Sequence, residues 1–207
     1  GPLGMSVNQA GAFVKSRPGL ERPNMHAYFN PMCYTPQKSA KRKLTNPEPW
    51  TGFLMSFNTC RPTSRGWLAI QSADPFAAPE IHPNSIATPE DIQDVFEGTA
   101  LLRRISSQGP LAEILDSERN PGPSVTTPDE ILADFRQRAS TVYHASCTCM
   151  MGPDPRSSVV DARLRVHGTQ GLRVADASVF PAVTSGNTNA PAIMVGEKTS
   201  DLLLADI

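Results

Sequence analysis

The sequence has almost no net charge and no long apolar run. Its 207 residues carry 19 Lys and Arg against 20 Asp and Glu, a formal net charge of −1. That balance offers no basic field for nucleic acid or for an anionic membrane surface. The apolar runs are too short to span a bilayer, and the start lacks the basic and apolar stretches of a signal peptide. We therefore expect a soluble globular protein without a nucleic-acid partner or a transmembrane segment.

Cysteine is also scarce. The four cysteines are Cys33, Cys60, Cys147 and Cys149. The single residue between the last two is fewer than the two to four that separate paired metal ligands, so no metal site is expected. Thiols two residues apart in a strand share a face and could form only a strained redox pair. The simpler interpretation is reduced, partly buried thiols, which are typical of a cytoplasmic protein.

The patterns that are present predict an α+β fold. Strands are expected over 26–29, within 50–60 and over 67–70, with the last two paired as an antiparallel hairpin. Helices are expected to begin after Thr88 and Thr127, because each threonine is an N-cap followed by proline and by acidic residues in the first turn. Loops are expected elsewhere before the first helix, including a polar, basic loop over 36–49.

From residue 141 onward the sequence predicts shorter secondary-structure elements. We expect short strands over 159–161, 164–166 and 171–176, followed by a polar turn at 185–189 and a final helix from about Ala190. That helix is expected to bury its apolar side chains, namely Ile193, Met194, Leu202 and Leu203.

Two features of this last third point to chemistry. His144 lies among small and polar residues, and histidine is the side chain best suited to exchange a proton near neutral pH. The turn at 185–189 opens a helix, whose N-terminus attracts anions. Each feature also has an ordinary structural explanation. A buried histidine is often only hydrogen-bonded in the fold, and Thr188 or Asn189 could simply cap the helix.

Several segments resemble the C-terminal motifs of the glucose–methanol–choline (GMC) oxidoreductases, in order and spacing. The segment 142–152, VYHASCTCMMG, is similar to the family's His-x-x-Gly-Thr-Cys-x-Met-Gly signature, although Cys147 stands where the family usually has glycine. Upstream, 64–75 resembles the strand pair of the substrate domain. The resemblance favours the choline-dehydrogenase-like branch, and its other segments are LRVHG at 164–168, GLRVADASVFP at 171–181 and SGNTNAP at 185–191.

The resemblance implies an FAD-dependent enzyme that removes the hydroxyl proton of an alcohol and transfers the α-hydride to flavin N5. It places the catalytic base at His144 and the second active-site position at Asn187. It implies a substrate-binding region over 1–140, with an antiparallel sheet and flanking helices. Residues 141–207 would return to complete the FAD-binding α/β domain. The cofactor-binding residues that it implies are Asp176, Ala177, Thr188, Asn189, Ala190 and Pro191.

The family's dinucleotide-binding turn, Gly-x-Gly-x-x-Gly, is missing from this sequence. We therefore expect the chain to act with an N-terminal FAD-binding portion, supplied by the same enzyme or by a separate chain, and a small alcohol as substrate. Two alternatives stay open at this point. One is a non-catalytic binding or assembly module that kept the fold, and the other is a redox protein that uses Cys147 and Cys149.

Overall fold

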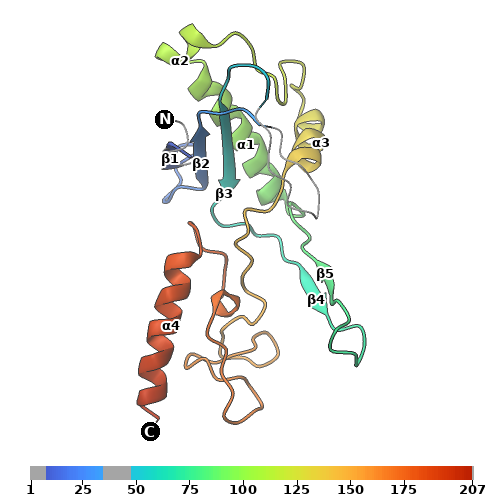
Figure 1. Cartoon of the computed structure of the whole chain (residues 1–207), viewed down its shortest axis with the longest axis vertical. Coiled ribbons are helices and arrows are strands. Elements are labelled where there is room, and N and C mark those ends of the chain that lie inside the picture. The colour runs from blue at the N-terminus through green and yellow to red at the C-terminus, as the bar shows by residue number, and fades with distance from the viewer. Residues whose placement is uncertain (1–7, 35–47, 207) are drawn as a thin grey trace. The chain divides into compact units, whose positions relative to one another are not determined.

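The computed structural model describes residues 8–34 and 48–206, which fall into two units (Figure 1). The first unit contains the described part of Gly1–Cys60 together with Thr88–Ser140, and the second contains Arg61–Ala87 and Thr141–Ile207. Residues 61–87 thus group with the C-terminal segment, and the predicted division into a substrate-binding region over 1–140 and a catalytic-motif segment over 141–207 stays a prediction. Antiparallel strands and helices confirm the α+β class. Most of the basic loop expected over 36–49 lies outside the described residues.

A three-stranded antiparallel sheet forms the centre of the first unit. Its strands are β1 (Ala10–Val14), β2 (Met25–Asn30) and β3 (Leu54–Thr59), in the order β1-β2-β3. The strands expected at 26–29 and within 50–60 are confirmed. The stretch containing β1 was expected to be a loop, and that expectation was wrong. Alanine and glycine give little strand signal, and β1 becomes a strand through its pairing with β2.

The two predicted helices of the first unit begin at the predicted caps. They are α1 (Pro89–Ser106) and α3 (Pro128–Arg138). The hydroxyl of Thr88 accepts a hydrogen bond from the backbone N–H of Asp91, and Thr127 forms a capping box with Glu130. A third helix, α2 (Gly109–Ile114), was not predicted. Its six residues are too few for a periodic pattern, and its N-cap residue makes no side-chain hydrogen bond.

Helix α1 packs closely on β3 because it carries a glycine at the contact. A Cβ atom on Gly98 would lie 2.2 Å from the nearest atom of the Phe57 ring. The Phe57 ring also contacts Phe135 of α3, with ring centroids 5.6 Å apart. Val95 and Leu101 of α1 are buried in the same unit. Gly98 therefore fixes the distance between helix and sheet.

The predicted hairpin between 50–60 and 67–70 was wrong. Strand β4 (Trp67–Ala69) pairs with β5 (Glu80–His82), which lies in a stretch expected to be a loop. The rings of Trp67 and His82 stack with centroids 4.0 Å apart. Gly66 permits this pairing, because a Cβ atom there would lie 2.1 Å from the carbonyl oxygen of His82. Hydrophobic patterning alone did not reveal that β4 would pair with β5 and not with β3.

The three strands expected between residues 159 and 176 were also wrong, since this stretch forms only isolated bridges such as Val160 to Val166. The hydrogen bonds of Asp161 explain why these bridges stay isolated and do not extend into strands. Its carboxylate accepts hydrogen bonds from the backbone N–H groups of Arg163 and Arg165 and from the Arg165 guanidinium, so the chain turns at once. Partial burial opposes ionisation of Asp161, but these hydrogen bonds outweigh it and lower its pKa to about 2.

Helix α4 (Asn189–Leu204) begins one residue before the predicted start. Val195 and Thr199 are buried, and Leu202 packs against a core of Val160, Leu164, Val179, Phe180 and Val195. The predicted burial of Ile193, Met194 and Leu203 was wrong, because these side chains are 58%, 58% and 47% exposed. The described part of the chain offers no further apolar layer to cover that face. Among the described residues, no helix is long and apolar enough to cross a membrane.

Candidate active site

The second unit brings His144 together with the turn that opens α4. The Nε2 atom of His144 lies 2.5 Å from Nδ2 of Asn187, and its Nδ1 atom lies 2.9 Å from Oγ1 of Thr188. More than forty residues separate these positions in the sequence, so only the tertiary fold joins them. The imidazole is partly buried, while Asn187 is exposed. Both predicted active-site positions thus occupy one exposed site.

The hydrogen bonds of His144 define which ring nitrogen carries the proton. The Nδ2 group of Asn187 can only donate, so Nε2 is the acceptor in that contact. A neutral imidazole then carries its proton on Nδ1, which donates to the hydroxyl of Thr188. The backbone N–H of Thr188 also points toward Nδ1, but at 3.5 Å, the limit for a hydrogen bond, so we assign the tautomer from the two shorter contacts. This tautomer leaves an unprotonated Nε2 beside Asn187, the form that a base requires.

Backbone hydrogen bonds fix the segment that follows His144. The N–H groups of Cys147, Cys149 and Met151 donate to the carbonyl oxygens of Ala177, Ser178 and Val179, at 3.3, 2.9 and 2.9 Å. Residues 177–179 form the short 3-10 helix η2 (Ala177–Val179), in which Val179 is fully buried. The segment 147–151 is therefore held against the core of its unit.

Asp176 and Ala177 were expected near the cofactor, and in the structure each forms hydrogen bonds with residues of its own unit. The Asp176 carboxylate caps η2 by accepting from the N–H of Ser178 at 2.7 Å. The side-chain and backbone hydrogen bonds of Ser178 hold the pKa of Asp176 below its usual value. The Ala177 carbonyl accepts from Cys147. A cofactor contact through these two residues stays a prediction.

The N-terminus of α4 presents backbone donors beside His144. The N–H groups of Asn189 and Ala190 make no hydrogen bond with any described residue, and both residues are exposed. Pro191 has no N–H to offer. Two orphan N–H groups and the positive end of the helix dipole would favour an electron-rich or anionic group here. Four of the predicted cofactor-binding residues, Thr188 to Pro191, lie at this helix end.

Arg61 steadies the same turn and was missed in the sequence, where it was assigned only to a loop. Its guanidinium donates to the hydroxyl of Ser185 at 2.7 Å. Within the turn, the hydroxyl of Thr184 donates to the carbonyl of Gly186 at 2.8 Å. A contact between residues 124 positions apart leaves no periodic or local signal, so the sequence could not have revealed it.

Cys147 adopts the backbone conformation that glycine favours. Its φ angle is +72°, in the left-handed region. The related family signature has glycine at this position, and glycine adopts positive φ angles without steric cost. The cysteine side chain packs against the buried core cluster, and its sulfur lies 3.3 Å from the hydroxyl of Ser146. Cys147 therefore has the left-handed backbone conformation together with the steric strain that its side chain causes there.

We expect Cys147→Gly to unfold at higher denaturant concentration than Cys147→Ala. Both changes remove the sulfur, but only glycine relieves the left-handed strain, which is worth about 1–2 kcal/mol. Glycine's greater freedom in the unfolded chain offsets roughly 0.5–1 kcal/mol of this gain. Chemical denaturation of the two variants measures the difference. An alanine variant at least as stable as the glycine variant would show that no strain is relieved.

The remaining cysteines and histidines have structural surroundings. The four cysteines carry reduced thiols. Across residues 8–34 and 48–206, no cluster of three or more His, Cys, Asp or Glu side chains could hold a metal ion. The Nε2 atom of His167 lies 3.1 Å from the carbonyl of Gly152 and 3.2 Å from the hydroxyl of Ser158, as expected for a structural histidine.

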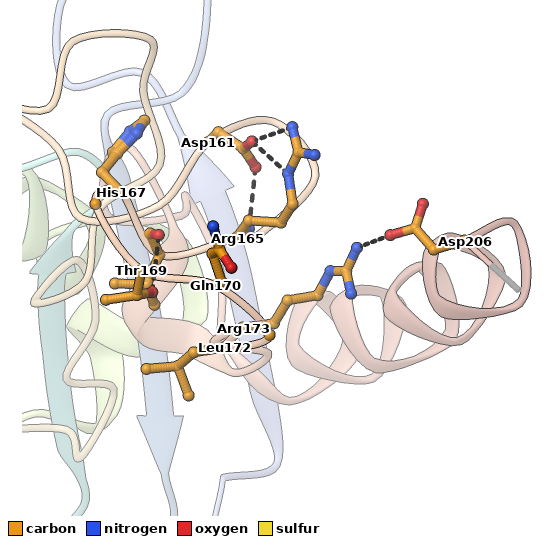
Figure 2. A pocket seen from close by; sticks show the side chains of 11 residues that line it. Asp161, Arg165, His167, Thr169, Gln170, Leu172, Arg173 and Asp206 are labelled. Atoms are coloured by element: carbon orange, nitrogen blue, oxygen red, sulfur yellow. Dashed lines mark hydrogen bonds and ion pairs between the residues drawn. The ribbon is translucent and has the colours of Figure 1, made fainter.

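A hollow lies elsewhere in this unit, with a volume of about 460 Å³ (Figure 2). Two arginine side chains that line it form ion pairs with carboxylates: Arg165 pairs with Asp161, and Arg173 pairs with Asp206. Because both guanidinium groups are already neutralised by carboxylates, the hollow has little attraction for an anionic ligand. His144 and Asn187 do not line it. The candidate site is therefore the His144 cluster.

Comparison with known proteins gives a family for this arrangement. Residues 62–196 match the model of the GMC oxidoreductase C-terminal domain. The chain belongs to the GMC oxidoreductase family. It is 40% identical to an alcohol dehydrogenase [acceptor] of Pseudomonas putida over 100% of the chain and 36% of that protein. It is 41% identical to the mitochondrial choline dehydrogenase of Mus musculus over 94% of the chain and 32% of that protein. It thus spans about a third of their length.

Solved GMC structures share the fold. Pyridoxine 4-oxidase from Mesorbium loti superposes with a TM-score of 0.79 over 94% of this chain and 37% of that chain, at 24% identity. A formate oxidase from Aspergillus oryzae, described for its FAD modification, gives 0.76 over 90% of this chain and 32% of that chain, at 28% identity. An FAD-dependent oxidoreductase from Chaetomium thermophilum gives 0.66 over 74% and 26%, at 34% identity. FAD is the cofactor associated with this family.

Proposed function

We propose that these residues form the C-terminal part of an FAD-dependent alcohol oxidoreductase, which oxidises a primary or secondary alcohol by proton abstraction and hydride transfer to flavin N5. The observation that carries the proposal is the contact of His144 with both Asn187 and Thr188 at the opening of α4. In this proposal residues 1–140 form the substrate-binding region. Residues 141–207 form the catalytic-motif segment that completes the FAD-binding α/β domain.

The residues at the start of α4 fit a flavin. The free N–H groups of Asn189 and Ala190 would hold an electron-rich ring edge, and the helix dipole adds a fixed positive potential. Thr188, Pro191 and the backbone of Asp176 and Ala177 would line the same cofactor. When bound, FAD supplies the acceptor for the hydride. The dipole needs no reorganisation to stabilise the negative charge that then develops.

The reacting alcohol would meet His144 and Asn187. The unprotonated Nε2 of His144 accepts the hydroxyl proton as a general base. Asn187 does not titrate, and its carboxamide can both donate and accept hydrogen bonds, so it holds the substrate oxygen. In the structure this carboxamide bonds to Nε2. Substrate would therefore exchange one hydrogen bond of Asn187 for another when it binds.

An N-terminal FAD-binding portion would be the partner of this chain. The chain spans 36% and 32% of two relatives and has no Gly-x-Gly-x-x-Gly turn of its own. The exposed apolar side chains on α4, Ile193, Met194 and Leu203, offer a surface for it. The partner would supply the site for the flavin pyrophosphate.

The decisive experiment uses a polypeptide in which this chain is joined to such an FAD-binding portion. We expect the purified protein to be yellow, and its flavin absorbance to bleach under anaerobic conditions when a small alcohol such as choline or benzyl alcohol is added. A panel of primary and secondary alcohols identifies the substrate class. A protein that folds and stays colourless, or that keeps its flavin colour with every alcohol, would favour the non-catalytic binding module instead.

A further inference from the structure

We propose that Thr188 is a positioning residue for His144: its hydroxyl holds the imidazole proton on Nδ1 and so keeps Nε2 free to act as the base. The inference rests on the proposed function, because it deepens the role of the same site. Its starting point is the 2.9 Å contact between Oγ1 of Thr188 and Nδ1 of His144. The family pattern had placed Thr188 only among the cofactor-binding residues.

Three of the described helices have a threonine at the N-cap, which permits an internal comparison. Thr88 and Thr127 are extended, with ψ angles of 151° and 153°, and both hydroxyls accept a hydrogen bond from the backbone three residues ahead. Thr188 is different. Its φ and ψ angles are −84° and −5°, and its side chain makes no capping hydrogen bond. The hydroxyl of Thr188 therefore forms a hydrogen bond with His144 and does not cap its own helix.

The position of proline explains this difference. Thr88 and Thr127 are followed directly by proline, so the N–H three residues ahead remains available and is the one that the hydroxyl accepts. After Thr188, proline comes at that third position, as Pro191, and proline has no N–H. The usual capping donor is thus missing at α4. The Thr188 hydroxyl is left with an open lone pair, and the imidazole N–H supplies the donor.

The geometry also makes Thr188 a firm support. Threonine is branched at Cβ, which restricts its χ1 rotation, and its backbone is already part of the rigid opening of α4. The neighbouring residue, Asn187, contacts the other ring nitrogen. A single dipeptide therefore holds both nitrogens of His144 and fixes the tautomer as well as the orientation of the ring. A base needs both to remove a proton efficiently.

The first test measures the tautomer directly in the 207-residue chain, without flavin. With ¹⁵N-labelled histidine, the wild-type chain should give a protonated Nδ1 signal and an unprotonated Nε2 signal for His144, assigned by their loss in His144→Gln. Thr188→Ser, which keeps the hydroxyl, should retain this pattern. Thr188→Val, which keeps the shape but loses the acceptor, should shift both signals toward averaging between tautomers. An unchanged spectrum in a folded Thr188→Val chain would overturn the proposal.

The second test separates positioning from helix capping. Thr127→Val is the matched control, because it removes a threonine that does cap its helix. We expect Thr127→Val to lower the denaturation midpoint while leaving the His144 signals unchanged. Thr188→Val should alter the signals with a smaller change in midpoint. The reverse pattern, with a large loss of stability and no spectral change in Thr188→Val, would make Thr188 an ordinary cap and would refute the inference.

In the flavin-loaded enzyme, Thr188→Val should reduce kcat by about 10- to 100-fold, since a misplaced reacting group costs of this order. Thr188→Ser should recover most of the rate, and KM should change little. If the tautomer depends on Thr188 but no alcohol reduces the flavin, the proposed function fails while the hydrogen bond stands. If alcohol reduces the flavin at full rate in Thr188→Val, the positioning role fails and the function stands.

Discussion

Replacing His144 with glutamine in the flavin-loaded enzyme should lower kcat by roughly 10²- to 10⁴-fold, the usual range for loss of a general base. Glutamine retains polar groups of similar reach but has no nitrogen that can accept a proton near neutral pH. The substrate hydroxyl would then have to release its proton without the Nε2 acceptor that the structure places beside Asn187. Anaerobic stopped-flow reduction of the flavin by alcohol measures the effect on the chemical step.

A matched histidine provides the control. His167→Gln removes an imidazole that contacts Gly152 and Ser158 and lies outside the candidate site. We expect this variant to bind flavin and to reduce it at a rate within a few-fold of wild type, with its main effect on stability. A His144→Gln enzyme that retains flavin and more than half of its reduction rate would remove His144 from the mechanism.

Gly98→Ala should destabilise the protein by up to about 2 kcal/mol, although alanine is the better helix former. The helix propensity of alanine favours the change by about 1 kcal/mol. Against this, the new Cβ would lie 2.2, 2.5 and 2.6 Å from three atoms of the Phe57 ring. A rigid ring that also contacts Phe135 cannot withdraw as a flexible side chain could, and overpacking of this kind costs about 1–3 kcal/mol. Urea-induced unfolding of the 207-residue chain measures the change.

The same substitution in α4 has the opposite expected sign. A Cβ atom on Gly196 would meet no atom within 4 Å, so Gly196→Ala should stabilise by roughly 0.5–1 kcal/mol through helix propensity alone. Combining Gly98→Ala with Phe57→Leu should cost less than the sum of the single changes, because the smaller side chain makes room for the methyl group. Equal effects at Gly98 and Gly196 would show that the contact with Phe57 does not limit the helix.

Local signals determined the helix starts and much of the candidate site. Thr88 and Thr127, each followed by proline and acids, contain within four residues all the groups that a capped helix end requires, so the two helices could be predicted. The motif segments around His144 and Asn187 revealed the family, which the comparison with known proteins confirmed. These features share one property, which is that neighbouring residues along the chain carry the whole signal.

Tertiary structure decided the rest. Strand β4 pairs with β5 and not with β3, because the choice depends on a backbone approach at Gly66 that hydrophobic patterning does not encode. The apolar residues of α4 gave a burial pattern, but which face is covered depends on the elements that pack on it. The sequence alone thus determined the family and the caps of α1 and α3, and it pointed to His144 and Asn187 as the candidate pair. Only the fold showed the contacts of Thr188 with His144 and of Arg61 with Ser185, because hydrogen bonds between residues far apart in the chain leave no local pattern.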